Sequence, residues 1–210
     1  TQISIVVIMA VMNNVLVIYG AQSKYGADIP LTVVGIVMKV FQIVISIVVG
    51  IAAGSQPIVG YNYGAGHWHR VKSIFRTMMM AEFCVGLISM ICFEAFPLQI
   101  INLFGSEDGL YNEFAVLAFR IFLGGIVLCC IQKSCSIFLQ SIGSPTLSMM
   151  LSLFRDFILS VPLTLILPRL SGVTMTLYSG PIADVVSFGA AVLFMSRILR
   201  ELDRLEDSAG

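Results

Sequence analysis

The chain has 210 residues, of which 58% are hydrophobic and 11% are charged, and its mean hydropathy is +0.96. Ordinary globular proteins carry roughly 25% charged residues, so this composition excludes a water-soluble domain. The 12 basic and 12 acidic residues balance to a formal net charge of zero, which gives no field that would attract nucleic acid. We therefore expect an all-α, polytopic membrane protein with the lipid bilayer as its surroundings and no nucleic-acid partner.

Six apolar stretches follow one another along the chain, and each is long enough to cross a bilayer as a helix of about 17 to 25 residues or more. They are predicted at about residues 3–19, 31–59, 74–96, 114–139, 146–167 and 173–199. Residues 1–200 are thus expected to form one six-helix transmembrane unit, followed by a charged cytoplasmic tail at 201–210. Because Thr1 opens directly into apolar sequence without a basic leader, we expect a piece of a longer protein.

Most prolines lie near the ends of these stretches, where a missing N–H costs little. Pro162 and Pro181 instead lie inside predicted spans. We therefore expect a kink or a partly unwound turn at each of these two positions.

The charges between the spans predict an orientation. Basic residues gather after the second span and near the C-terminus: Arg70, Lys72, Arg76, Arg197, Arg200 and Arg204. The connection after the third span carries only acidic charges: Glu107, Asp108 and Glu113. Short cytoplasmic loops are enriched in Lys and Arg. The 60–76 loop and both ends of the chain are therefore predicted to lie in the cytoplasm, with the protein in the inner (plasma) membrane.

The end of the second span carries the most unusual sequence in the chain. Gly50 and Gly54 form a G-x-x-x-G pattern, which lets a neighbouring membrane helix approach closely. The glycine-rich and aromatic segment that follows is predicted to be a helix-ending connection with a gating or structural role: Gln56, Pro57, Gly60, Tyr61, Asn62, Tyr63, Gly64 and Ala65.

Ionisable side chains within the bilayer are costly and usually face the bundle interior or a wet cavity. Arg155 and Asp184 lie deepest, near the middle of consecutive antiparallel spans, and we expect them to form or share a buried polar network. Asp156 follows Arg155 directly and is expected on a different side of the helix. Three others lie nearer to span ends and are expected to snorkel toward the membrane surface: Glu82, Arg120 and Lys133.

The chain offers no pattern for enzyme chemistry. It has no convincing nucleophile–base pair and no phosphate-binding glycine loop, and His67 and His69 lack a third metal ligand. The five cysteines all fall in apolar runs, where they fit packing roles. Membrane spans with a polar interior favour a transporter or channel over an enzyme.

The chain resembles the multidrug and toxic compound extrusion (MATE) family, and within it the C-terminal six-helix lobe of bacterial members. The resemblance rests first on Gln56-Pro57-Ile58-x-Gly60-Tyr61-Asn62-Tyr63-Gly64-Ala65 followed by Arg70-Val71-Lys72. Three other matches support it: Asn14-x-x-x-x-Tyr19-Gly20, the run Phe138-Leu139-Gln140-Ser141-Ile142-Gly143 leading into Ser148 and Arg155, and Pro181-Ile182-Ala183-Asp184. These matches extend over essentially the whole chain.

The resemblance implies one lobe of a two-lobe, twelve-helix antiporter that exchanges Na⁺ or H⁺ for organic, often cationic, compounds bound between the lobes near the membrane midplane. The implied partners are those compounds and an N-terminal six-helix lobe of the same polypeptide, and no cofactor is expected. Candidate cavity or network residues are Asn14, Gln42, Gln140, Arg155 and Asp184.

Ion coupling is expected mainly in the N-terminal lobe. Some family members use acidic residues in the first and fourth helices of the C-terminal lobe. Here the first predicted span offers Asn13 and Asn14, which do not titrate, and the fourth carries Arg120 and Lys133. The site for Na⁺ or H⁺ is therefore expected in the other half of the protein.

Three alternatives remain. A lipid-linked oligosaccharide flippase of the same superfamily fits the span pattern, but the Gln56–Ala65 segment argues against it. A membrane scaffold that oligomerises through Gly50 and Gly54 would leave the deep charges without a purpose. An intramembrane enzyme ranks last.

Overall fold

The computed structural model describes residues 2–105 and 109–209, and all regular secondary structure in these ranges is helical, which confirms the all-α prediction. Glu107 and Asp108, two of the acidic charges expected after the third span, lie outside the described residues. In chain order the helices are α1 (Gln2–Ala21), α2 (Asp28–Gly64), α3 (Trp68–Ala95), α4 (Pro97–Asn102), α5 (Gly109–Phe122), α6 (Ile126–Ser141), α7 (Pro145–Leu153), the π-helix η1 (Phe154–Ser160), α8 (Val161–Ser171), α9 (Val173–Thr176) and α10 (Ser179–Ala209).

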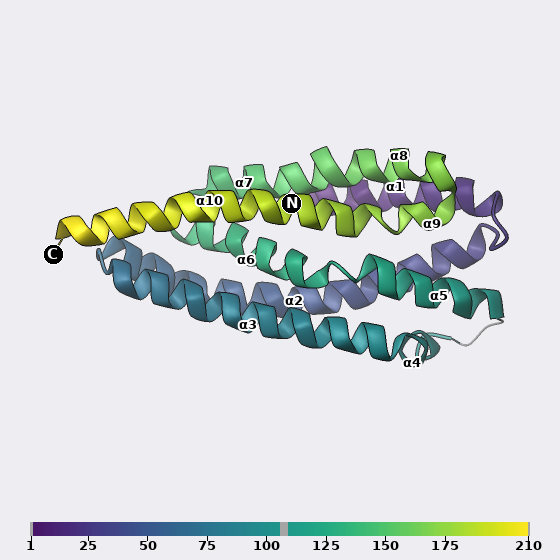
Figure 1. The fold of residues 1–210 in the computed structure, drawn as a ribbon, viewed down its shortest axis with the longest axis horizontal. Helices are drawn as coiled ribbons and strands as arrows, with labels where there is room; N and C mark the ends of the chain where they lie inside the picture. The colour runs from purple at the N-terminus through teal and green to yellow at the C-terminus, as the bar shows by residue number, and fades with distance from the viewer. Residues whose placement is uncertain (1, 106–108, 210) are drawn as a thin grey trace.

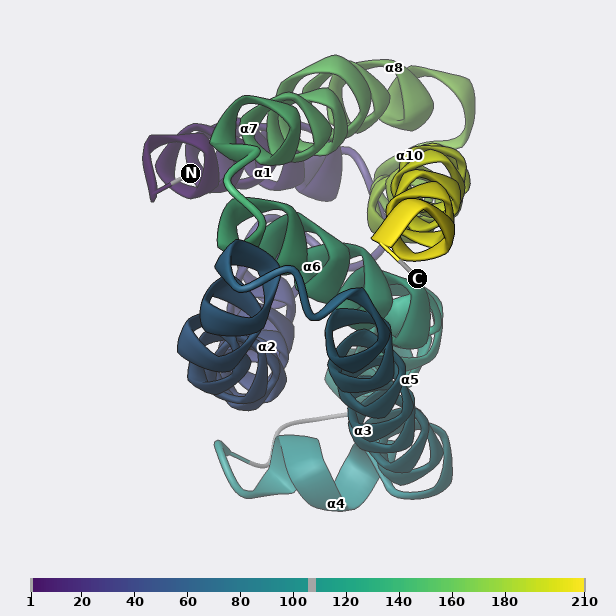
Figure 2. The same ribbon diagram turned by 90° about the vertical axis from the view of Figure 1, so that its left-hand side faces the viewer.

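The helices form an elongated bundle with α6 in its middle. Figure 2 shows α2 and α3 on one side of α6 and α1, α7 and α8 on the other, with α10 alongside. The α2–α3 turn, the α6–α7 turn and the C-terminal end of α10 meet at one end of the bundle, at the left of Figure 1. Five continuous helical runs in the described residues are long and apolar enough to span a membrane, and the bent pair α5 and α6 makes a sixth.

The bundle is held together by two apolar clusters. One joins α2, α5 and the ends of α1 and α3 around the buried rings of Phe114 and Phe119. The other joins α2, α3, α6 and α10 around Phe138 and Leu139. Large apolar side chains also remain on the outside, among them Ile88 at 62% and Leu193 at 67% exposure. In a bilayer such outward side chains meet lipid, so the helices associate mainly through close packing.

Side-chain contacts tie the helices together at both ends of the bundle. At one end, Lys24 in the α1–α2 connection lies 2.7 Å from Glu113 on α5, and this hydrogen bond raises the pKa of Lys24. At the opposite end, Lys72 on α3 pairs with Asp203 and Glu206 on α10. The charged residues expected as a tail therefore continue α10 as a helix to Ala209 and pack back on α3.

The segment Gln56–Ala65 is not a connection, contrary to the sequence prediction. Helix α2 runs through Pro57 to Gly64, and the turn comprises only residues 65–67. Two polar side chains bond to carbonyls within the helix: Ser55 Oγ to Ala52 at 2.7 Å and Asn62 Nδ2 to Ile58 at 2.8 Å. The segment also packs against α6, since a Cβ added at Gly60 would lie 3.4 Å from the Ser141 carbonyl, and this tertiary contact supports the helical backbone.

A Schellman motif ends α2. The amide of His67 donates to the Asn62 carbonyl at 2.9 Å, and that of Gly66 to the Tyr63 carbonyl at 3.2 Å. Gly66 has a φ of +72°, the left-handed conformation that this motif places after a helix and that glycine adopts without strain. The Tyr63 and Trp68 rings then pack edge to face across the turn, with centroids 5.2 Å apart.

Three predicted spans are interrupted. The fourth breaks at residues 123–125 into α5 and α6, which are bent by 43°, and Gly124 and Gly125 explain the break since glycine propagates a helix poorly. The fifth widens into η1 just before Pro162, whose missing N–H removes a hydrogen bond from the preceding turn. The sixth unwinds between α9 and α10, at residues 177–178, shortly before Pro181.

The G-x-x-x-G pattern does not mediate helix packing within the described residues. A Cβ added at Gly50 or Gly54 would meet no heavy atom within 4 Å. Close helix contact occurs instead at Gly86 on α3, where an added Cβ would lie 3.0 Å from the Cα of Val127. No close helix approach is thus seen at Gly50 and Gly54 within the described residues, and a close approach by a helix outside them stays a prediction.

Candidate functional site

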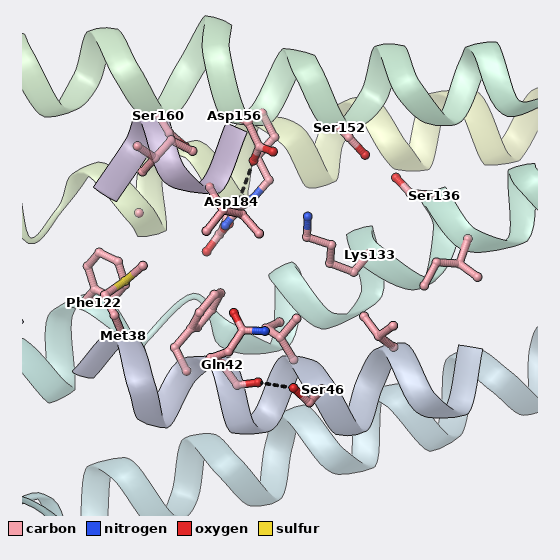
Figure 3. A pocket seen from close by; sticks show the side chains of 18 of the residues that line it. Met38, Gln42, Ser46, Phe122, Lys133, Ser136, Ser152, Asp156, Ser160 and Asp184 are labelled. Carbon is pink, nitrogen blue, oxygen red and sulfur yellow. Dashed lines mark hydrogen bonds and ion pairs between the residues drawn. The ribbon is translucent and has the colours of Figure 1, made fainter. Parts of the chain in front are cut away.

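A pocket of about 560 Å³ lies between α1, α2, α6, the α7–η1–α8 run and α10 (Figure 3). Its volume falls in the range of roughly 300–1,000 Å³ that is typical of ligand sites. One wall, from α2, is largely apolar and includes Met38, Phe41 and Ile45. Ile5, Ile8 and Met12 add apolar surface from α1, which packs beside η1 and α8. The wall opposite α2 is polar and carries Arg155 and Asp156 on η1 and Asp184 on α10, while Lys133 projects from α6 between the two walls. The pocket is thus amphipathic.

A buried ion network forms the polar wall. Arg155 on η1 donates through Nε to Oδ1 of Asp184 on α10 at 2.8 Å, and through Nη1 to Oδ1 of Asp156 at 3.1 Å. Its Nη2 lies 3.5 Å from Sγ of Cys129 on α6. The side chains of Arg155, Asp156 and Asp184 are only 12%, 3% and 4% exposed. Buried charges require such pairing, because an isolated one would be strongly disfavoured.

The predicted Arg155–Asp184 network is confirmed, but the position expected for Asp156 is wrong. Asp156 shares the guanidinium with Asp184, although it is adjacent to Arg155 in sequence. The π-helical turn of η1 changes the angle between successive side chains, and the long arginine side chain can fold back toward its neighbour.

Gly125 lets Asp184 approach the break between α5 and α6. A Cβ added at Gly125 would lie 3.1 Å from Oδ2 of Asp184 and 3.2 Å from the Cα of Pro181. Only glycine leaves this space, so the break brings α10 close enough for its carboxylate to reach Arg155.

Two of the three side chains expected to snorkel do not. Lys133 is half-buried and lines the pocket, and Figure 3 shows its amine pointing into the open space between the two walls. Glu82 is fully buried in α3. Arg120 alone is more than half exposed, and its Nε lies 3.5 Å from Glu94. Depth along a span does not show which way a side chain faces, which is why the prediction failed for Lys133 and Glu82.

Gln42 and Gln140 line the pocket as expected. Gln42 projects from α2 beside Ser46, and Gln140 on α6 donates through Nε2 to Ser148 Oγ at 2.8 Å. Asn14 does not reach the pocket: it is exposed on α1, where Nδ2 donates to the Ala10 carbonyl at 3.0 Å. The structure therefore brings four of the five candidate residues together and leaves Asn14 apart.

Sequence reasoning missed a polar stripe on the α7–η1–α8 run. Its members recur at every fourth position and all line the pocket: Ser152, Asp156, Ser160 and Thr164. This spacing places side chains on one helix face, so the pattern could have been found. The Gln56–Gly64 segment lies outside the pocket, and an added Cβ at Gly60 would lie 3.4 Å from the Ser141 carbonyl, which indicates a packing role between α2 and α6.

Membrane-length helices around an amphipathic pocket with a buried ion network define one helical lobe of a multi-pass membrane protein. The family model MatE matches residues 3–166, and the chain belongs to this family. The resemblance stated from the sequence motifs is thereby confirmed.

Known relatives share the similarity over most of this chain. A probable multidrug resistance protein, YoeA of Bacillus subtilis (strain 168), is 26% identical over 164 residues, which cover 77% of this chain and 35% of YoeA. The crystal structure of MATE in the straight conformation matches with a TM-score of 0.86 at 19% identity, over 97% of this chain and 44% of that chain. An outward-facing multidrug resistance MATE family transporter of the MOP superfamily matches with a TM-score of 0.83 at 18% identity, over 97% and 44%. The chain thus spans less than half the length of these relatives.

Proposed function

We propose that this chain is the C-terminal lobe of a secondary active multidrug efflux antiporter, which exchanges Na⁺ or H⁺ for organic, often cationic, compounds across the plasma membrane. The observation that carries the proposal is the pocket: apolar surface from α1 and α2, a polar wall from η1 and α10, and a paired ion network among membrane-length helices. An apolar surface beside a few placed polar groups suits amphipathic organic molecules. Family membership and the multidrug resistance relatives support the same interpretation.

A second six-helix lobe of the same polypeptide is the partner that this function requires. The chain matches less than half of its relatives, and two-lobe carriers bind substrate between their lobes. Gly54 is exposed on α2, and a Cβ added there would meet no heavy atom within 4 Å, so this part of α2 is available for contact with that lobe. We propose that the main coupling-ion site lies in the other lobe, because both carboxylates of the pocket are already paired with Arg155.

The test is dye accumulation in cells that produce the full-length protein. Bacteria that lack their own major efflux systems should retain less of a cationic fluorescent dye when they make this protein. Collapse of the membrane ion gradients with an ionophore should abolish the difference. Equal dye retention with and without the protein, or translocation of a lipid-linked sugar in place of the dye, would contradict the proposal.

A further inference from the structure

Glu82 is a buried carboxyl that the pocket does not use. It lies in the middle of α3 and is 0% exposed. Both of its carboxyl oxygens are shielded from solvent and have no hydrogen-bond partner within the described residues. An ionised carboxylate in such a place is strongly disfavoured, whereas a protonated one is tolerated. A buried polar group without a partner requires an explanation.

The surroundings of Glu82 are provided mainly by α6. The polar side chain that faces it is Ser134, whose Oγ is also buried and without a hydrogen-bond partner among the described residues. One turn further along α3, Gly86 brings the two helices into close contact, with an added Cβ 3.0 Å from the Cα of Val127 and 3.5 Å from Sγ of Cys130. Glu82 and Ser134 thus form a small polar site inside a tight seam.

No cation neutralises Glu82 within the described residues. The groups that interact with it are Ser134 and the Cys130 thiol, both on α6. Helix α3 also packs against α2, α4, α5 and α10. The charged side chains on these elements and on α6 face elsewhere or are paired: Lys39 is exposed, Arg120 pairs with Glu94, Asp184 pairs with Arg155, and Lys133 lines the pocket.

We propose that Glu82, with Ser134, is a proton-binding site of this lobe that acts in addition to the main coupling-ion site of the other lobe, and that its protonation is coupled to the position of α6. The carboxyl holds a proton from bulk water in the closed seam. When the carboxyl releases that proton to water on the opposite side of the membrane, a buried carboxylate is left. This charge favours a conformation that admits water between α3 and α6. This inference rests on the proposed antiport function.

The structure connects this site with the pocket through α6. One face of α6 carries Ser134 toward α3, and another face carries Lys133 and Gln140 into the pocket. The break at residues 123–125 separates α6 from α5, so α6 can tilt without carrying α5 along. A change in the protonation of Glu82 can thereby change the positions of Lys133 and Gln140 in the pocket.

The first test detects the proton itself. Infrared spectra of the purified full-length protein in lipid should contain the carbonyl stretch of a protonated carboxyl at neutral pH. Glu82→Gln should remove that band. The control Glu94→Gln, on the exposed part of the same helix, should leave it unchanged. A band that Glu82→Gln does not affect overturns the proposal.

The second test measures coupling. Glu82→Gln, a neutral mimic of the protonated state, should bind dye as the unmodified protein does, while dye transport driven by a pH gradient falls by about tenfold or more. Unchanged pH-driven transport in Glu82→Gln overturns the proposal and leaves the antiport function standing. A protein that keeps the infrared band but transports no dye contradicts the antiport function and leaves the proton site standing. If Glu82→Gln fails to fold, Glu82→Asp must shift the pH at which the band disappears, and an unshifted band counts against the site.

Discussion

Arg155 on η1 and Asp184 on α10 form a buried ion pair, with Nε 2.8 Å and Nη2 2.7 Å from the same carboxylate oxygen. The pair joins the π-helical turn of the fifth span to the start of α10, next to the break between α5 and α6. It therefore closes one wall of the pocket and holds three interrupted spans in register.

Neutralising either partner should destabilise the lobe through a shared mechanism. Arg155→Gln leaves two buried carboxylates without a cation, and Asp184→Asn leaves the guanidinium with Asp156 alone; each should cost about 3 to 5 kcal/mol. The double variant should cost less than the sum of the two by about 0.5 to 3 kcal/mol, because one interaction is lost only once. Thermal unfolding of the full-length protein in detergent measures the loss of stability in the two single variants and in the double variant. Additive losses would show that the two residues are not coupled.

Gly125→Ala should disturb the same region by a steric route. The added methyl group would lie 3.1 Å from Oδ2 of Asp184, and forcing α10 outward should cost about 1 to 3 kcal/mol. Gly35→Ala in α2 is the matched control, since an added Cβ there meets nothing within 4 Å. We expect a lower melting temperature for Gly125→Ala and an equal or higher one for the control. Equal melting temperatures for both variants would mean that α10 does not depend on the space at Gly125.

Lys133→Gln should strengthen the binding of cationic dyes. The ammonium projects into the pocket. Two unit charges about 4 Å apart repel by about 1 kcal/mol at the dielectric constant of water, and removing this repulsion corresponds to roughly fivefold in affinity. Fluorescence titration of the full-length protein measures this change. Lys39→Gln, on an exposed part of α2 that does not line the pocket, should have no effect. Unchanged or weaker binding of the cationic dye by Lys133→Gln would contradict this repulsion.

Much of the ion network was predictable, but its local geometry was not. Arg155 and Asp184 could be paired because they are the deepest charges on consecutive spans. The π-helical turn that also brings in Asp156 depends on tertiary packing and on Pro162, which no local pattern specifies. The segment Gln56–Gly64 misled the prediction because its glycines and Asn62 are typical of a loop, whereas the packing of Gly60 against α6 supports a helical backbone. Glu82 and Lys133 show that depth along a span does not reveal the face of the helix.

The orientation of the lobe remains a prediction that labelling can test. Two exposed residues lie in connections at opposite ends of the bundle: Gln22 between α1 and α2, and Ala65 between α2 and α3. In a background with the exposed Cys84 and Cys92 replaced by serine, Ala65→Cys should react with a membrane-impermeant maleimide only in inside-out vesicles. Gln22→Cys should react only from the outside of intact cells. The opposite pattern would invert the topology that the basic residues predict.

The most direct test of the account is transport by the purified full-length protein in liposomes. An imposed Na⁺ or H⁺ gradient should drive an organic cation against its own concentration gradient, and collapsing the ion gradient should stop the movement. Dye movement that persists without any ion gradient, or no movement under either gradient, would contradict the proposal that this lobe belongs to a multidrug antiporter.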